Sequence, residues 1–239
     1  MCGRFTQQRP ASDLAEIFDA EDRIGAPGGH FNIAPTNEAA VVVQRDERRA
    51  IAAYRWGLIP HWAKDAKIGN RMFNARAETV AISPAFRDAF RRRRCIVPVD
   101  SFYEWRRDGK VRQPFRIVRT DGRPLAVAGL WAAWKEPSTE AVVRTFTIIT
   151  GEPIDGVREI HDRMPIVLHE DAWPLWLDPA LGDPGELQAM LTPFEGLDLD
   201  IYPVGSKVNN VRFDGPELIE PVVLAAGPPP SAEGRLLLG

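Results

Sequence analysis

The chain has 239 residues, of which 44% are hydrophobic and 26% are charged, proportions typical of a globular protein that can bury a sizeable core. No stretch approaches the roughly 20 apolar residues of a membrane-spanning helix, and the opening residues MCGRFTQQRP lack the apolar segment of a secretion signal. Two cysteines and four histidines, without a CxxC spacing, argue against a disulfide framework and against a metal site. We therefore expect a cytoplasmic protein that uses no metal and no cofactor.

The net charge of −3 is unevenly distributed along the chain. Residues 71–116 contain 12 lysines and arginines against 5 aspartates and glutamates, whereas the remaining residues contain 18 against 28. A basic segment inside an acidic chain can build a positive groove for the phosphates of a nucleic acid. The arginine run at 91–94 is equally typical of a solvated helix face.

Residues 1–64 predict a short helix followed by paired strands. Ser12 precedes an amphipathic helix at 13–20 with acidic residues in its first turn. The segments that follow are a turn-rich link at 31–37, two strands at 40–44 and 50–56 joined by a hairpin tip, and an aromatic loop at 56–64.

The rest of the chain is rich in strands, with helices at intervals. Residues 74–82 and 83–93 are typical of helices, the second capped by Ser83 with Pro84 at its first position. Residues 170–177 and 183–191 predict two late helices, the second capped by Asp183. Because the elements do not alternate regularly as strand and helix, the fold class is α+β with peripheral helices, in one domain over residues 1–224 and a flexible tail at 225–239. The strands predicted here are 95–99, 102–107, 114–120, 125–131 and 144–150.

Cys2 stands at the one position where a cysteine can offer two nucleophiles. Removal of Met1, which is usual when the second residue is small, would give Cys2 a free α-amine beside its thiol. The amine could condense with an aldehyde to an imine, and the thiolate could then close a five-membered thiazolidine ring. A cysteine at this position is also common without any function. Cys95, beside an apolar strand, is expected to be buried and inert.

Glu104 is a candidate for general acid–base chemistry. Strand alternation places Tyr103 and Trp105 on one face and Phe102 and Glu104 on the other. A carboxylate among aromatic rings has a raised pKa and suits proton transfer near neutral pH. The alternative is a surface residue paired with a neighbouring arginine.

His161 and Asn74 are further candidates. His161 lies in a polar turn beside Asp162 and Arg163, where a partner can orient it or where it can be exposed and idle. Asn74 could simply cap the helix predicted at 74–82. Flat faces on which unpaired bases could stack come from Trp56, Trp62 and Trp105, residues that are also ordinary in a core.

Several segments together point to one family. MCGRF, NIAPT, WGLIPHWA, FNARAET, PVDSFYEW, AVAGLW, FTIIT and IHDRMPIVL occur in the order and spacing of that family. The chain resembles the SOS response-associated peptidase (SRAP) family of abasic-site processing proteins from Met1 to about Val211. The resemblance implies a compact β-barrel-like core of mostly antiparallel strands with flanking helices. It also implies a covalent crosslink to abasic sites in single-stranded DNA, proteolytic removal of the protein's own N-terminal residue, and a monomer that joins the nucleoid when bound to DNA. Whether a lyase activity accompanies the crosslink is left open.

The resemblance assigns roles to individual residues. Cys2 matches the crosslinking cysteine, and Asn74 matches the asparagine near the thiazolidine. Glu104 matches the carboxylate that assists sugar-ring opening and proton transfer, and His161 the histidine that aids formation and reversal of the crosslink. The matching DNA-binding positions are Arg4, Arg76 and Arg163 for phosphates and Pro35, Trp56 and Trp105 for a kinked strand.

Two functions of other classes remain open from the residues alone. In an N-terminal-nucleophile amidohydrolase, the Cys2 thiolate would attack an amide while its own α-amine acts as the base. In a simple single-strand-binding module, Cys2 would have no role. The basic segment and the aromatic residues favour DNA, and a crosslink that survives denaturation would exclude the simple module.

Overall fold

The computed structural model describes residues 2–45, 47–109, 111–194 and 196–224. Its helices are α1 (Ala11–Phe18), α2 (Arg87–Arg92), α3 (Trp173–Leu177) and α4 (Pro184–Ala189), with 3-10 turns η1 (Ala66–Arg71), η2 (Glu170–Ala172), η3 (Ser206–Asn209) and η4 (Pro216–Ile219). Its strands are β1 (Phe5–Gln7), β2 (Ala20–Asp22), β3 (His30–Ile33), β4 (Glu38–Arg45), β5 (Arg48–Trp56), β6 (Asn74–Arg76), β7 (Arg94–Val99), β8 (Ser101–Asp108), β9 (Val111–Arg119), β10 (Leu125–Lys135), β11 (Val142–Gly151), β12 (Met164–Pro165) and β13 (Leu199–Pro203).

Five strands close into a barrel. The chain pairs β5 with β4, β4 with β7, β7 with β10 and β10 with β11, each time antiparallel. β11 then returns to β5 in parallel, with Phe146 opposite Trp56. Closure removes the free edges that an open sheet would expose. The expected α+β fold with a barrel-like, mostly antiparallel core is confirmed.

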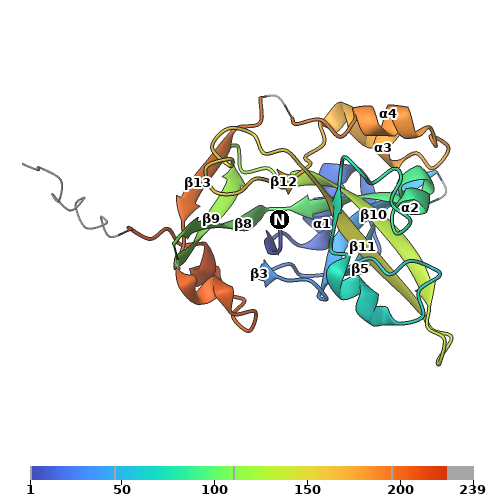
Figure 1. Cartoon of the computed structure of the whole chain (residues 1–239), viewed down its shortest axis with the longest axis horizontal. Helices are drawn as coiled ribbons and strands as arrows, with labels where there is room; N and C mark the ends of the chain where they lie inside the picture. Colours follow the sequence, from blue (N-terminus) through green and yellow to red (C-terminus); the bar gives the residue numbers. More distant parts are fainter. Residues whose placement is uncertain (1, 46, 110, 195, 225–239) are drawn as a thin grey trace, which may run out of the picture.

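A second sheet has the strand order β13-β9-β8-β1-β3 and lies on the side of the barrel away from α2, α3 and α4 (Figure 1). The N-terminal strand β1 lies inside this sheet, because Phe5 pairs with Ile33 of β3 and with Phe102 of β8. Residues 2–4, which come just before Phe5, therefore lie next to β3 and β8 and do not project into solvent.

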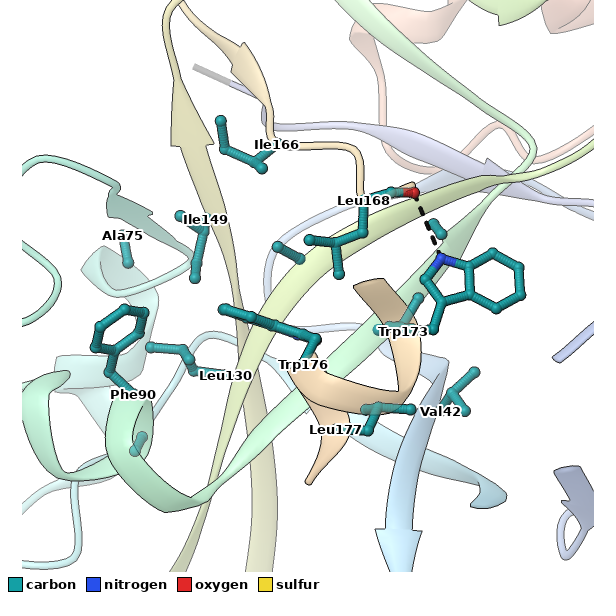
Figure 2. Close-up of a cluster of buried hydrophobic side chains, with 14 of the residues drawn as sticks. Val42, Ala75, Phe90, Leu130, Ile149, Ile166, Leu168, Trp173, Trp176 and Leu177 are labelled. Atoms are coloured by element: carbon teal, nitrogen blue, oxygen red, sulfur yellow. Dashed lines mark hydrogen bonds between the residues drawn. The ribbon is translucent and has the colours of Figure 1, made fainter. Parts of the chain in front are cut away.

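The apolar core has two main parts. One part lies under the helices, where Trp176 of α3 and Phe90 of α2 pack against Leu130 and Ile149 of the barrel (Figure 2). The indole of Trp173 also donates a hydrogen bond of 3.4 Å to the Leu168 carbonyl, drawn in the same view. The other part surrounds the N-terminal segment and includes Cys2, Phe5, Trp56, Phe102 and Phe146.

The helix predicted at 74–82 does not form. Asn74–Arg76 is strand β6 instead, paired in parallel with Ile148–Thr150 of β11, and turns follow. Edge pairing to a buried strand satisfies the backbone of this short segment, so tertiary contacts outweigh its local preference for a helix. The alternative that Asn74 caps a helix is wrong for the same reason.

The predicted helix starts are only partly correct. α1 begins at Ala11 after Pro10, and Ser12 contributes no cap. The helix expected from Ser83 begins only at Arg87, after a turn. The cap at Asp183 is confirmed, since its carboxylate accepts from Gly185 N and Glu186 N.

The loop at 56–64 depends on a glycine. Gly57 has a φ of +117°, and a Cβ there would lie 2.5 Å from the Gly69 carbonyl oxygen, so no other residue fits without displacement of the backbone. The expected turn-rich link at 31–37 contains strand β3 in its first half. The tail predicted at 225–239 lies outside the described residues. Within those residues, no helix is long and apolar enough to cross a membrane.

Candidate functional site

Cys2 lies in the short segment before β1, which runs beside β8. The backbone N–H of Tyr103 donates to the Arg4 carbonyl at 3.0 Å, which extends the β1–β8 ladder beyond Phe5 towards the N-terminus. The side chain of Cys2 has no exposed surface, and Sγ lies 3.9 Å from the Arg4 carbonyl. Burial raises the pKa of this thiol well above its ordinary value, and the nearby charge of Glu104 raises it further.

Asn74 contacts Cys2 directly. Its Nδ2 donates to the Cys2 carbonyl at 2.7 Å, although the two residues are 72 positions apart. Asn74 Oδ1 is buried and accepts no hydrogen bond from the described residues. The parallel pairing of β6 with β11 sets this geometry, and the Trp56 indole supports it by donating to the Phe73 carbonyl at 2.8 Å.

Glu104 is buried on the Cys2 side of β8. Only 2% of its surface is exposed, and burial raises the pKa of its carboxyl group from 4.5 to about 7. The predicted alternation is confirmed, because Phe102 packs in the Cys2 cluster whereas Tyr103 and Trp105 pack in a separate cluster on the other face. The surface alternative for Glu104 is therefore wrong.

His161 lies in the loop before β12. Its ring Nδ1 accepts from the Arg163 backbone N–H at 3.0 Å and lies 2.8 Å from Asp162 Oδ1. Burial lowers the pKa of His161. The charge of Asp162 acts on the pKa of both His161 and Glu104, which places the loop within electrostatic reach of the buried carboxyl group.

Arg4 and Trp105 form one unit at the edge of the site. The Arg4 guanidinium lies over the Trp105 ring, 6.0 Å from its centre. Arg4 Nη1 donates to Asn32 Oδ1 at 2.8 Å, and the Trp105 indole donates to Asn209 Oδ1 at 2.7 Å. Asn32 and Asn209 were not found from the sequence. Asn32 belongs to the NIAPT segment, but only the fold shows that its amide meets Arg4.

The remaining predicted DNA-binding residues differ in exposure. Arg76 is exposed, whereas Arg163 is hydrogen-bonded to Glu78 and Thr150. Pro35 is partly buried in a turn closed by the Asn37 N–H and the Ala34 carbonyl.

The two loop tryptophans behave differently. The expectation that Trp56 presents a flat face to bases is wrong for this structure, because its side chain is completely buried in the barrel core. Trp62 is 50% exposed.

The basic segment at 71–116 does not line a single surface. Arg91 and Arg92 are exposed on α2, as the solvated-face interpretation predicts. Arg94 is buried and donates to the carbonyls of Phe90 and Trp176. Only some of the basic side chains of this segment are therefore accessible to phosphates. Among the described residues, no group of three or more His, Cys, Asp or Glu side chains could hold a metal ion.

Comparison with known proteins gives relatives along nearly the whole chain. The abasic site processing protein YoqW of Bacillus subtilis is 41% identical, in a match that covers 92% of this chain and 99% of YoqW. The abasic site processing protein YedK of Escherichia coli is 32% identical over 93% of this chain and 100% of its own.

A crystal structure of a Bacteroides thetaiotaomicron protein shares the fold. It has a TM-score of 0.82 at 23% identity and covers 93% of this chain and 100% of its own. The family model of the SOS response associated peptidases (SRAP) matches residues 1–211, and the chain belongs to this family.

Proposed function

We propose that this protein processes abasic sites in single-stranded DNA, and that it captures the aldehyde of the lesion covalently at Cys2 once Met1 has been removed. The observation that carries the proposal is the 2.7 Å contact between Asn74 and Cys2 beside the buried carboxyl group of Glu104. It is supported by family membership and by relatives that are named for abasic site processing.

The first step forms an imine. While Met1 is attached, the Cys2 nitrogen is an amide and cannot attack; its removal frees an α-amine, whose ordinary pKa is about 7.7–8.0. The amine adds to the aldehyde carbon, and the resulting hydroxyl leaves as water when it receives a proton. Glu104, with a pKa of about 7, exists in both protonation states near neutral pH and can supply that proton.

The second step closes the ring. The Cys2 sulfur bonds to the imine carbon and the ring nitrogen gains a proton, so the net reaction releases one water and involves no oxidant. Because burial keeps the thiol protonated at neutral pH, sulfur attack needs a base, and the carboxylate form of Glu104 can accept the thiol proton. Asn74 holds the Cys2 carbonyl, and its Oδ1 can accept from the amine.

His161 acts on the sugar side of the reaction in this proposal. Nδ1 accepts from the Arg163 N–H when the ring carries its proton on Nε2, whereas its distance of 2.8 Å to Asp162 Oδ1 suits a ring that is protonated on Nδ1. A lowered pKa keeps the ring neutral at neutral pH, so it can both donate and accept a proton during ring opening and crosslink reversal. The imine is also the species from which a β-elimination would proceed, so a lyase activity would share its first step.

Single strands suit the residues at the edge of the site. Trp105 is partly exposed and Trp62 is half-exposed, and each could stack on an unpaired base. Exposed Arg76 could contact a phosphate. One chain supplies every residue of the proposed reaction, so a monomer would suffice.

The test compares protein with and without Met1 on an oligonucleotide that carries one abasic site. Protein that lacks Met1 should form a complex that survives denaturation, with the mass of both components less one water. Protein that retains Met1 should form none, because an acylated nitrogen cannot form the imine. Equal crosslinking by both forms would overturn the proposal. An N-terminal-nucleophile amidohydrolase would instead show turnover of an amide substrate and no stable DNA adduct.

A further inference from the structure

Arg163 links two parts of the site that are distant in sequence. Its Nη1 and Nη2 donate to the two carboxylate oxygens of Glu78 at 3.0 and 2.9 Å. Its Nε donates to Thr150 Oγ1 at 3.2 Å, and Nη2 donates to the Thr150 carbonyl at 2.5 Å. Because two parallel hydrogen bonds join the guanidinium to the carboxylate, they set the relative orientation of the two groups as well as the distance between them.

The two ends of this link carry proposed catalytic residues. Glu78 follows β6, the strand that bears Asn74, and Ala77 N–H donates to the Thr150 carbonyl at 2.9 Å. At the other end, the backbone N–H of Arg163 donates to the His161 ring. The Arg163 side chain thus connects the strand of Asn74 with the loop of His161 across the end of β11.

We infer that Glu78 is a positioning residue, which through Arg163 holds the His161 loop in place against β6 and therefore against Asn74 and Cys2. This inference rests on the proposed function, and it adds a residue to which no role was assigned from the sequence. The Glu78–Arg163 pair is defined here as the clamp.

The clamp differs from an ordinary surface ion pair. Although the Glu78 side chain is 51% exposed, that of Arg163 is only 16% exposed, and Arg163 is also held by two hydrogen bonds to Thr150 of β11. The hydrogen bond with Arg163 also lowers the pKa of Glu78 below its ordinary value. By contrast, Arg119 makes a two-pronged contact through Nε and Nη2 with Asp121 only two residues away, so that pair connects no distant segments and serves as a control.

The clamp also changes what is expected of Arg163 towards DNA. Four of its five N–H groups donate to Glu78 and Thr150, which leaves one N–H on Nη1. Arg163 can therefore offer a phosphate its charge and this remaining N–H, whereas Arg76 is exposed. Replacing Arg163 should slow the reaction even at saturating DNA, where a lost phosphate contact no longer limits the rate.

A double-mutant cycle tests the clamp. Glu78→Gln and Arg163→Gln should each slow crosslinking at saturating DNA by about 10- to 100-fold, the loss expected from a misplacement near 1 Å. The double variant should be no slower than the slower single variant, because both changes break the same contact. Asp121→Asn should remain within about twofold of the parent protein, since the Arg119–Asp121 contact is local and joins no segments of the site. Losses that multiply in the double variant would overturn the inference.

Two further readouts separate positioning from a general loss of structure. Affinity for undamaged single-stranded DNA should be unchanged in Glu78→Gln, which keeps the positive charge of Arg163; weaker binding by Glu78→Gln would assign its effect to DNA binding and overturn the clamp. Hydrogen exchange of the amides at 157–165, measured without DNA, should be faster in Glu78→Gln and unchanged in Asp121→Asn.

The exchange measurement needs no crosslinking. If the parent protein fails to crosslink, the proposed function is contradicted, but hydrogen exchange still tests the clamp. If Glu78→Gln leaves exchange at 157–165 unchanged, the clamp falls whatever the chemistry of Cys2.

Discussion

The protein buries an ionisable side chain in each of two regions, Arg94 under the helices and Glu104 beside the N-terminal segment. Under the helices, the Arg94 guanidinium donates to the carbonyls of Phe90, Trp176 and Leu181, whereas the side chain of the next residue, Cys95, packs in the same core cluster as Cys2. At the N-terminal segment, Cys2 lies near Glu104. Burial raises the pKa of both thiols, so burial by itself does not identify the reactive cysteine.

The difference lies in what surrounds each ionisable group. Burial lowers the pKa of Arg94 only to about 10, and the guanidinium stays charged at neutral pH among carbonyl acceptors. Burial moves the pKa of Glu104 to about 7, where it exchanges a proton readily. Arg94 therefore stabilises the fold, whereas Glu104 is suited to chemistry. Only Cys2 has a backbone nitrogen that removal of a single residue turns into an amine.

The most direct test of whether Cys2 alone is reactive is to replace each cysteine by serine. Cys2→Ser keeps the α-amine but closes the ring poorly, because a hydroxyl is a much weaker nucleophile than a thiolate. We expect its adduct to hydrolyse unless borohydride traps the imine, whereas Cys95→Ser should give a stable adduct like the parent. Adduct survival without reductant is the measurement. Equal survival with Cys2→Ser would mean that only the amine matters.

The second prediction concerns the rate of crosslinking. Glu104→Gln preserves the shape of the side chain but cannot exchange a proton, so crosslinking should slow by about 10²–10⁴-fold, the range for a positioned acid or base. The rate is measured at saturating abasic DNA, with unfolding midpoints as a control for folding. A rate within twofold of the parent would assign Glu104 to structure.

The third prediction concerns stability at the opposite region. Arg94→Met keeps an apolar stem but leaves several buried carbonyls without a donor, so the free energy of unfolding should fall by about 3 kcal/mol. Crosslinking per folded molecule should not change, because Arg94 lies on the helix side of the barrel. Denaturant unfolding and active-site titration give the two values. A slowed reaction in folded Arg94→Met would show that the two regions are coupled.

Sequence patterns predicted the long elements of the fold well. Strands β4, β5 and β7 to β11 carry long runs of β-branched and aromatic residues, so their local pattern and their burial agree. The three-residue strands β1 and β6 are too short for such a pattern. Their conformation depends on partners far along the chain, as the 74–82 segment shows.

The site was predictable only as far as individual residues. Alternation placed Glu104 on the same face as Phe102 without showing that this face is buried, and position alone singled out Cys2. The contact of Asn74 with Cys2 spans 72 residues and depends on β6 pairing with β11, which no local pattern encodes. Trp56 and Arg94 were misjudged because indoles and guanidinium groups occur both on binding surfaces and in cores, where hydrogen bonds to carbonyls satisfy them.

The last prediction uses pH to compare the two buried ionisable groups. Glu104 has an ordinary pKa of 4.5 in the unfolded chain and about 7 in the folded protein. Between these values the folded state keeps a proton that the unfolded chain has released, so stability falls as pH rises. The contribution of the neutral carboxyl group is complete below pH 4.5 and is lost as pH rises through 7.

The expected loss across this window is roughly 2–3 kcal/mol, and Glu104→Gln should not show it, because an amide does not titrate. Relative to the parent, Glu104→Gln should therefore become progressively more stable from pH 4.5 to 7, with no further change above. Arg94→Met should instead lower the free energy of unfolding by the same amount at every pH in this window, since the pKa of Arg94 lies at about 10, outside the window. Unfolding by urea at a series of pH values measures both curves. Parallel curves for Glu104→Gln and the parent would mean that Glu104 is ionised in the folded protein throughout, and would remove the basis for its role as a proton donor at neutral pH.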